Sequence, residues 1–448
     1  MNGYPINVLN QGSYVSTTNP FPVTLGFNSA SSSNYVTISP SGTSGDAFGR
    51  LRTSQCYTLG DYKHMYTIDP LFVNSSNGGS IVHNADKACV TLSTNTTANS
   101  YFIHQTRAYH NYQPGKGHFV MSSINFLGTQ TNVTKRTGYF DNSNGIFVEL
   151  DGNGILSFNI RNTTSGTIST NRVVQSNWNG DKLDGSGTSG YTINMSQTQL
   201  FFTDFQWLGV GRVRCGFVLG GNFIVGHEFN HANIIPAVYL SYPSLPVRCE
   251  IRNTGIVSSP GGSMDQICAT VISEGGYVET GYDFSYTPTS GRSVTALSTL
   301  PVLCIALKNT FKNLPNRMVV KMVNMFVFSD TKPILYELRV VPSVNNVVGG
   351  SWAPVDNDSG VQYNFGATSL TNLGTAIANG MVPASQTGGS TQQLTSAVSQ
   401  LAGSTARQNL IAQNFDSTDS QVYLLYVRNI DTTAATNVYA GMQWREIY

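Results

Sequence analysis

Apolar side chains recur at every second position on both sides of a Gly-Gly-Asn turn at residues 220–222, and this spacing constrains the fold more than any other feature of the chain. The alternating residues are Val213, Cys215, Phe217 and Leu219 before the turn and Phe223, Val225, His227 and Phe229 after it. A period of two is typical of strands, whereas a helix repeats its apolar positions every three to four residues. The segment therefore predicts an antiparallel hairpin.

The same segment contains the motif H-E-x-x-H at residues 227–231. On a helix this motif places two imidazoles on one face to bind zinc, with the glutamate as general base. In the hairpin, Glu228 points away from both His227 and His231 and cannot serve as their base. A zinc hydrolase would require this segment to be helical, or the two histidines to meet a third ligand, so we predict no metal site here.

A three-residue loop, Gly220–Asn222, sets the expected register of the hairpin. It pairs Gly216 with Gly226 and places Arg214 opposite Glu228 as a cross-strand salt bridge. A two-residue turn would pair apolar with polar positions and lose these matches. We therefore expect Arg214 and Glu228 to be structural or assembly residues.

Composition favours the same fold class and excludes several partners. Only 11% of the residues are charged, against about 25% in an ordinary soluble domain. Instead the chain has 44 Gly, 22 Tyr and 22 Phe, a mixture suited to many short strands joined by tight turns. A net charge of +1 gives no basic surface for nucleic acid. No segment approaches the ~18 unbroken apolar residues of a membrane span, so we expect neither nucleic acid nor membrane as a partner.

The order of strand and turn signals divides the chain of 448 residues into three regions. Residues 1–45 are too polar to form a core and are expected to be an extended N-terminal arm that packs on a neighbour, with a flexible linker as the alternative. Residues 46–290 are predicted to form a first β-sandwich or jelly-roll-like domain, and residues 291–448 a second β-rich domain. The second domain contains a polar excursion at 372–412, with a short helix expected near 393–401. The arm and the excursion are expected to be assembly contacts.

The remaining patterns give no coherent catalytic set. Residues 113–117 lack the spaced glycine and the Ser/Thr of a phosphate loop, and residues 141–145 lack the carboxylates of a calcium loop. No nucleophile elbow and no triad spacing occur. We therefore predict no catalytic, cofactor-binding or metal-ligating residues. Six scattered cysteines and the lack of a secretion signal predict free thiols in a protein folded in the cytoplasm, at Cys56, Cys89, Cys215, Cys249, Cys268 and Cys304.

Four aromatic residues leave two interpretations open. Tyr109, Tyr112, Trp178 and Trp207 suit a sugar-stacking platform of a lectin-like sandwich. Packing in a core is the default for such side chains. The sequence does not separate these two interpretations.

Several motifs together resemble the virion structural, tail-associated proteins of marine tailed phages. They are Asn19-Pro20-Phe21-Pro22-Val23, the segments 46–52, 112–116, 178–185 and 207–214, and Gln443-Trp444-Arg445-Glu446. The resemblance covers most of the chain, but the motifs carry no known chemistry. It implies a virion component assembled in the host cytoplasm, without fixing its place in the particle.

Within segment 46–52 we expect a structural clasp. Asp46 is suited to capping a turn, and Arg50 and Arg52 alternate with Leu51 on an extended segment, where they can pair with carboxylates of the body or of an adjacent subunit.

The sequence therefore predicts a non-enzymatic structural component of a tailed phage virion, as a fibre, baseplate or tail-surface subunit. Its expected partners are copies of itself in a homo-oligomer, other virion proteins and a host surface glycan. One alternative is a capsid decoration or minor capsid protein. Another is a carbohydrate-binding module of the lectin-like sandwich type.

Overall fold

The computed structural model describes residues 9–10, 13–14, 24–27, 36–39, 54–383 and 410–448. Strands dominate these residues, and their helical elements are two short 3-10 turns, η2 (Gln175–Asn177) and η3 (Val344–Asn346). None of the helical elements in this part of the chain is long or apolar enough to cross a membrane. The predicted all-β fold of sandwich type is confirmed.

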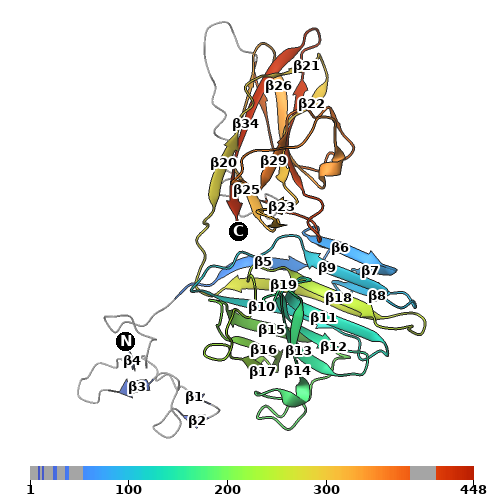
Figure 1. Cartoon of the computed structure of the whole chain (residues 1–448), viewed down its shortest axis with the longest axis vertical. Coiled ribbons are helices and arrows are strands. Elements are labelled where there is room, and N and C mark those ends of the chain that lie inside the picture. The colour runs from blue at the N-terminus through green and yellow to red at the C-terminus, as the bar shows by residue number, and fades with distance from the viewer. Residues whose placement is uncertain (1–8, 11–12, 15–23, 28–35, 40–53, 384–409) are drawn as a thin grey trace, which may run out of the picture. The chain divides into compact units, whose positions relative to one another are not determined.

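The chain divides into two compact units, residues 1–56 and residues 57–448. The first unit contains two antiparallel pairs (Figure 1). The strands are β1 (Leu9–Asn10) with β2 (Ser13–Tyr14), and β3 (Thr24–Phe27) with β4 (Val36–Ser39). The predicted clasp residues Asp46, Arg50 and Arg52 lie outside the described residues, as does the helix expected near 393–401.

Two antiparallel sheets form the first sandwich of the second unit. The eight-stranded sheet consists of β5 (Tyr57–Lys63), β7 (Gly79–Asn84), β8 (Cys89–Thr94), β10 (Gly117–Asn125), β15 (Gln199–Gln206), β16 (Val213–Leu219), β17 (Asn222–Phe229) and β19 (Ser263–Ser273). The seven-stranded sheet consists of β6 (Phe72–Asn77), β9 (Tyr101–Thr106), β11 (Val133–Phe140), β12 (Gly145–Leu150), β13 (Leu156–Asn162), β14 (Ser169–Val174) and β18 (Val247–Asn253). The strand orders are β17-β16-β15-β10-β19-β8-β7, with β5 on β19, and β14-β13-β12-β11-β18-β9-β6.

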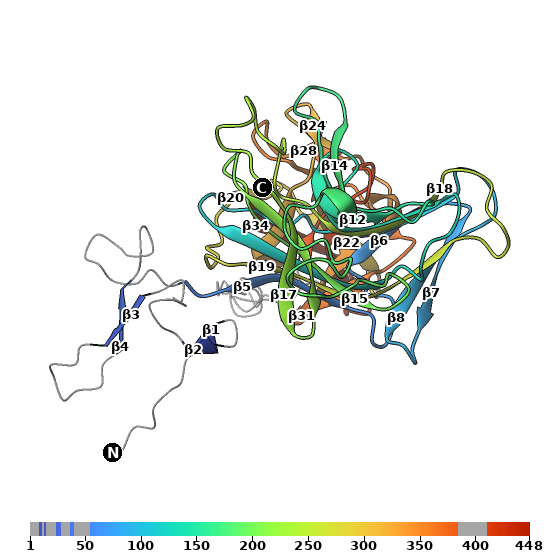
Figure 2. The ribbon, with the colours of Figure 1, turned by 90° about the horizontal axis from the view of Figure 1, so that it is seen from below.

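The two sheets face each other across an apolar core. Figure 2 shows β12 and β18 in one layer and β5, β15 and β19 in the other. Phe158 of the seven-stranded sheet contacts Phe201 and Phe217 of the eight-stranded sheet, with ring centroids 5.9 Å apart in both pairs. Because successive strand residues point to opposite faces, the side chains between these core positions form the outer face of each sheet.

The second sandwich is built from two further antiparallel sheets. The five-stranded sheet consists of β20 (Tyr282–Tyr286), β21 (Arg292–Val294), β25 (Val319–Ser329), β32 (Leu410–Ile411) and β34 (Thr436–Ile447). The six-stranded sheet consists of β22 (Thr299–Leu307), β26 (Ile334–Val341), β28 (Ala353–Pro354), β29 (Val361–Asn364), β31 (Thr375–Val382) and β33 (Val422–Asn429). Two small pairs complete it: β23 (Thr310–Phe311) with β24 (Leu314–Pro315), and β27 (Val347–Val348) with β30 (Ser369–Leu370).

Two predicted boundaries need correction. Strand β20, at residues 282–286, pairs with β34, so the second sandwich begins before the predicted boundary at 290. Strand β31, at residues 375–382, pairs with β26 inside the predicted excursion 372–412. Both are edge strands, which need less apolar surface than central ones. The Ala/Gly-rich composition of residues 375–382 hid β31, and β20 was assigned to the first domain because its partner β34 lies about 150 residues further along the chain.

The hairpin of β16 and β17 confirms half of the predicted register. Val213, Arg214 and Cys215 pair with Phe229, Glu228 and His227, as expected. Nearer the turn the pairing shifts by one residue, because the turn is the two-residue Gly220-Gly221, both with positive φ. The extra residue is accommodated as a β-bulge at Gly226.

The bulge exists because a neighbouring loop packs against it. The backbone amides of Gly180 and Asp181 donate to the carbonyls of Gly226 and Val225, at 2.9 and 3.0 Å. A Cβ on Gly226 would lie 2.8 Å from Trp178. Long-range packing therefore decided the register at this point.

The predicted salt bridge of the hairpin is wrong, although its two residues are register partners. Arg214 pairs instead with Asp204 of β15, and Glu228 lies 3.7 Å from Arg212. The H-E-x-x-H motif lies on a strand and the residues after it, so the helical zinc geometry does not form. His227 accepts a hydrogen bond from the amide of Asn179, and His231 Nδ1 lies 2.7 Å from the Gly211 carbonyl.

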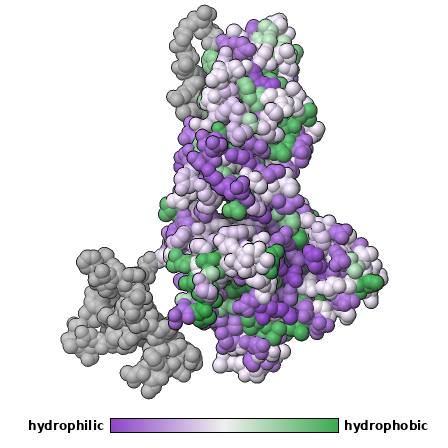
Figure 3. All heavy atoms as spheres, in the orientation of Figure 1, coloured by the Kyte–Doolittle hydropathy of each residue, from purple (hydrophilic) through white to green (hydrophobic). Residues whose placement is uncertain are grey.

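The molecular surface is mixed in character. On the face shown in Figure 3, hydrophobic residues form separate patches among hydrophilic ones. Exposed apolar side chains include Phe223 and Leu200 of the eight-stranded sheet.

Candidate ligand-binding face of the seven-stranded sheet

The outer face of the seven-stranded sheet carries charged side chains at neighbouring positions of three strands. Arg136 of β11 is the register partner of Glu149 on β12 and of Glu250 on β18. The adjacent residues on β11, Lys135 and Thr137, lie on the opposite face because strand side chains alternate. Pairing of the strands thus brings residues more than 100 positions apart into contact.

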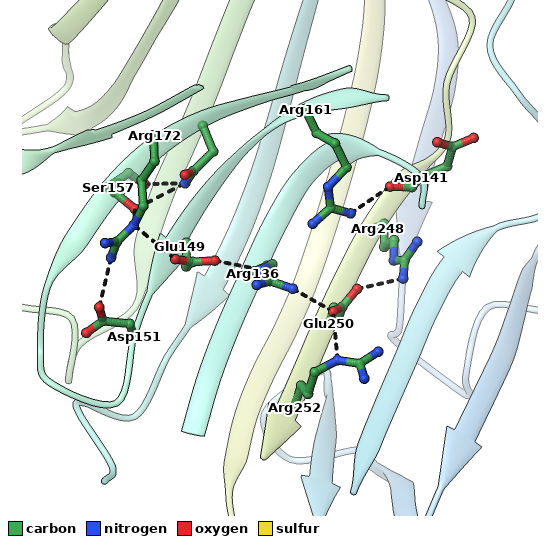
Figure 4. A network of polar contacts seen from close by, with 11 residues as sticks. Arg136, Asp141, Glu149, Asp151, Ser157, Arg161, Arg172, Arg248, Glu250 and Arg252 are labelled. Atoms are coloured by element: carbon green, nitrogen blue, oxygen red, sulfur yellow. Dashed lines mark hydrogen bonds and ion pairs between the residues drawn. The ribbon is translucent and has the colours of Figure 1, made fainter. Parts of the chain in front are cut away.

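These side chains form a continuous chain of ion pairs across the sheet (Figure 4). Arg136 lies 2.7 Å from Glu149 and 2.8 Å from Glu250. Arg248 lies 2.6 Å from the other oxygen of Glu250, and Arg172 of β14 contacts Glu149 at 3.3 Å. Arg172 also pairs with Asp151 at 2.8 Å, and Arg252 with Glu250 at 3.6 Å.

Glu250 is the acid at the centre of this face. Burial opposes its ionisation, but the charges of Arg248, Arg136 and Arg161 outweigh burial and lower its pKa to about 2. Its side chain is 3% exposed. Glu250 is therefore a fixed carboxylate throughout the neutral range.

Two phenylalanine rings lie on the same face. Phe140 is the register partner of Gly145, and Phe147 that of Gly138. A Cβ on Gly145 would lie 2.1 Å from Phe140, and a Cβ on Gly138 would lie 2.9 Å from the Phe147 side chain. The glycines thus let both rings lie close to the sheet, with centroids 4.6 Å apart.

Arg248 closes one end of the face. Its guanidinium lies 5.1 Å from the ring centroids of both Phe140 and Phe415, a residue of the segment between β32 and β33. It also donates to Asn142 at 2.9 Å and is 1% exposed. This end of the face is buried against the second sandwich and is not open to a ligand.

The other end of the face, on β13 and β14, is more open. Arg172 has a side chain that is 35% exposed, and Arg161 is half-buried. Arg161 donates to the carbonyl of Asp141 at 3.0 Å and lies over the Phe147 and Phe140 rings at 5.0 and 5.7 Å. Burial and the neighbouring charge of Arg136 lower the pKa of Arg161 to about 10, so it remains a cation at neutral pH.

Buried polar atoms without a partner mark this face as incompletely satisfied. The Asn159 amide nitrogen donates to Ser157, but its Oδ1 has no hydrogen-bond partner among the described residues, and neither have Gln105 Oε1 and Arg248 Nε. All three side chains are 1% exposed. Such atoms are uncommon in a folded protein and call for an explanation.

Apart from this face, a cavity of about 520 Å³ lies within the unit of residues 57–448. Its walls include Tyr57 and Tyr277, whose rings stack at 5.2 Å, and the Lys321–Glu279 ion pair at 2.6 Å. The cleft has the size of a small-molecule site. Lys321 and Glu279 of its lining already pair with each other, and the outer face of the seven-stranded sheet carries more charged groups, so we regard that face as the stronger candidate.

The sequence did not single out this face. Arg214 and Glu228 lie on the eight-stranded sheet, and Asp46, Arg50 and Arg52 are not among the described residues. The signal available was Arg248, Glu250 and Arg252, which alternate with apolar residues along one strand. That alternation predicts a charged outer face but not its partners.

The predicted alternative of an aromatic platform is wrong. Tyr109, Tyr112 and Trp178 are buried, and Trp207 is half-buried against the core. Trp178 stacks on Phe158 at 4.1 Å, and the indole of Trp207 donates to the Leu240 carbonyl. Core packing, the other interpretation, accounts for these residues.

Within the described residues no group of three or more His, Cys, Asp or Glu side chains is arranged to hold a metal ion.

Comparisons with known proteins give only distant likenesses. No protein-family model matches the chain, and no curated protein matches it. Among solved structures, the Emp47p carbohydrate recognition domain is 12% identical, with a TM-score of 0.31, covering 48% of this chain and 95% of that one. The CBM2 module of the evolved Dit of Lactobacillus casei BL23 phage J-1 is 7% identical, with a TM-score of 0.33, covering 51% and 100%.

Proposed function

We propose that this chain is a non-enzymatic glycan-binding protein that uses the outer face of the seven-stranded sheet, at its β12–β14 end. The observation that carries the proposal is the buried Asn159 acceptor, which has no partner among the described residues, set beside the arginines of the same face. A hydroxyl-rich ligand supplies both donors and acceptors, and planar Arg, Asn and Glu groups are suited to binding them in fixed geometry.

The charge state of the face favours binding without cleavage. Glycoside hydrolysis ordinarily requires a carboxylic acid whose pKa is raised, so that it can protonate the leaving oxygen. The pKa of Glu250 is instead lowered to about 2 by its arginine neighbours. Glu149 is held by both Arg136 and Arg172. Both carboxylates orient the arginines, and Glu250 does not serve as an acid.

An array of bacterial and host-cell surface glycans tests the proposal, with the full chain as the probe. We expect binding to at least one glycan class, and hydrogen exchange in the complex should show protection of amides in β12, β13 and β14. The Arg212→Gln variant is the matched control, because Arg212 lies outside this face and its side chain is 51% exposed. Absence of binding, or protection confined to other strands, would contradict the proposal.

We further propose that the protein acts as a virion component of a tailed phage, in a homo-oligomer. The specific support is the set of sequence motifs that resemble tail-associated proteins. Three of these motifs have structural roles in the first sandwich: residues 178–181 pack on the β-bulge, and the amide of Trp207 in one motif donates to the Tyr112 hydroxyl of another at 2.9 Å.

Deletion of residues 1–40 tests this second proposal. We expect both sandwiches to fold, because they lie in the separate unit of residues 57–448. We also expect the shortened chain to lose oligomerisation or incorporation into particles. A shortened protein that oligomerises and incorporates like the full chain would refute the assembly role of the arm.

A further inference from the structure

We propose that the glycan bound by this face is acidic, and that its carboxylate or sulfate group pairs with Arg161. This inference rests on the proposed glycan-binding function and specifies the class of ligand.

The pairing of charges singles out Arg161. Every other arginine of the face, at positions 136, 172, 248 and 252, has a carboxylate partner within 3.6 Å. Arg161 has none among the described residues; its recorded polar partner is a backbone carbonyl. Counting the carboxylates of Asp141, Glu149, Asp151 and Glu250 against these five arginines leaves an excess of one positive charge, 5 − 4 = +1.

Glu250 and Asp141 act on Arg161 electrostatically, but their carboxylates are in direct contact with other groups. Glu250 is already shared among Arg136, Arg248 and Arg252. The carboxylate of Asp141 accepts hydrogen bonds from the hydroxyls of Tyr109 and Tyr242 and from the amide of Asn144 at 2.8 Å. An anion from outside the chain is therefore the group that would complement the charge of Arg161.

The geometry suits an anion that presents two oxygens to the guanidinium. The Phe147 and Phe140 rings lie against the Arg161 guanidinium and support its plane. Its hydrogen bond to the Asp141 carbonyl uses one terminal nitrogen. Guanidinium groups bind carboxylate and sulfate-like oxygens in pairs, with the bonds strengthened by the charge. Arg161 thus provides a directed anion site and not a diffuse positive surface.

Asn159 supplies the second contact of a saccharide. It lies two residues before Arg161 on β13, on the same face and roughly 7 Å away along the strand. Its buried Oδ1 is an acceptor for which the described part of the chain supplies no donor. A sugar hydroxyl can donate to Asn159 while an acidic group of the same chain binds Arg161, which a small inorganic anion cannot do.

A matched pair of ligands tests the inference. The acidic ligand is a hexamer of galacturonic acid, and the neutral one is the same hexamer with every carboxylate methyl-esterified. A sulfated chondroitin hexamer forms the third arm, and inorganic sulfate the fourth. Calorimetric titration of the full chain is performed with the parent protein, Arg161→Gln, Arg161→Lys and the control Arg212→Gln.

We expect at least one acidic hexamer to bind about tenfold or more tightly than the esterified hexamer, with an affinity that falls as salt is added. Arg161→Gln should lose this preference, Arg161→Lys should keep part of it, and Arg212→Gln should keep all of it. Preference for uronate or for sulfate would identify the anion.

Three outcomes would overturn the inference. Equal binding of acidic and esterified hexamers would refute the acidic class while leaving glycan binding intact. Acid binding that Arg161→Gln leaves unchanged would place the anion elsewhere. Binding of inorganic sulfate as tight as that of the hexamers would show a simple anion site. If neither these hexamers nor any array glycan binds, the proposed function itself fails.

Discussion

The first sandwich should lose stability in mild acid because histidines are buried in its core, where burial disfavours their charged form. His118 on β10 is fully buried, and neither of its ring nitrogens has a hydrogen-bond partner among the described residues. Its ring packs against Tyr112 and Phe205, with centroids 5.0 and 5.6 Å apart. Burial, and secondarily the charge of His110, lowers its pKa from 6.5 to about 3.

The direction of the effect follows from the two pKa values. The unfolded chain, with a histidine pKa near 6.5, takes up a proton before the folded chain does. Stability is therefore complete above pH 6.5 and decreases as the pH falls from 6.5 towards 3. From pH 7 to pH 5 this single histidine costs about 2 kcal/mol. His64, whose pKa burial lowers to about 4, adds a similar loss of about 2 kcal/mol.

The assay is hydrogen exchange of core amides in β10 and β15, which reports the free energy of opening the first sandwich. The His118→Phe variant retains an aromatic ring in an aromatic cage but cannot titrate. It should lose about 2 kcal/mol less than the parent protein between pH 7 and pH 5. Equal losses in parent and variant would refute the reasoning, since carboxylates contribute equally to both.

Three further predictions concern other parts of the fold. Glu250→Gln should destabilise the first sandwich by about 3–5 kcal/mol, because it leaves buried arginines without their partner. Denaturant unfolding measures this cost. The control is Glu228→Gln, at a half-exposed position, and an equal cost for both variants would contradict the prediction. Gly226→Ala should cost about 1–3 kcal/mol and lower the melting temperature, because its new Cβ would clash with Trp178 and Phe158; an unchanged melting temperature would show that the bulge is not tightly packed. Thiol titration of the native protein should find the exposed Cys56 and Cys268 reactive and the four buried thiols slow. Burial raises the pKa values of three of these, Cys215, Cys249 and Cys304, to about 12. The unreduced, denatured protein should yield six reactive thiols, and two or fewer would reveal disulfides.

Local patterns predicted the strands better than their ends. The alternation at residues 213–229 identified β16 and β17 and half of their pairing, because side-chain direction in a strand is a local property. The shift at Gly226 was not predictable, because it depends on the loop at residues 178–181. The partner of Arg214 was mistaken for a related reason: β15 flanks β16 on its other side and presents Asp204 at the same level.

The sequence by itself determined the all-β class, the position of the hairpin and the alternation of charged with apolar residues along strands such as β18. Only the tertiary structure decided which charges meet. Arg136 and Glu250 are 114 residues apart in the chain and become neighbours through the pairing of β11 with β18. Strand order and register also place Arg161 where no carboxylate of the described residues forms an ion pair with it. Ion pairing across a sheet depends on strand order and register, which are set by long-range packing and not by local periodicity.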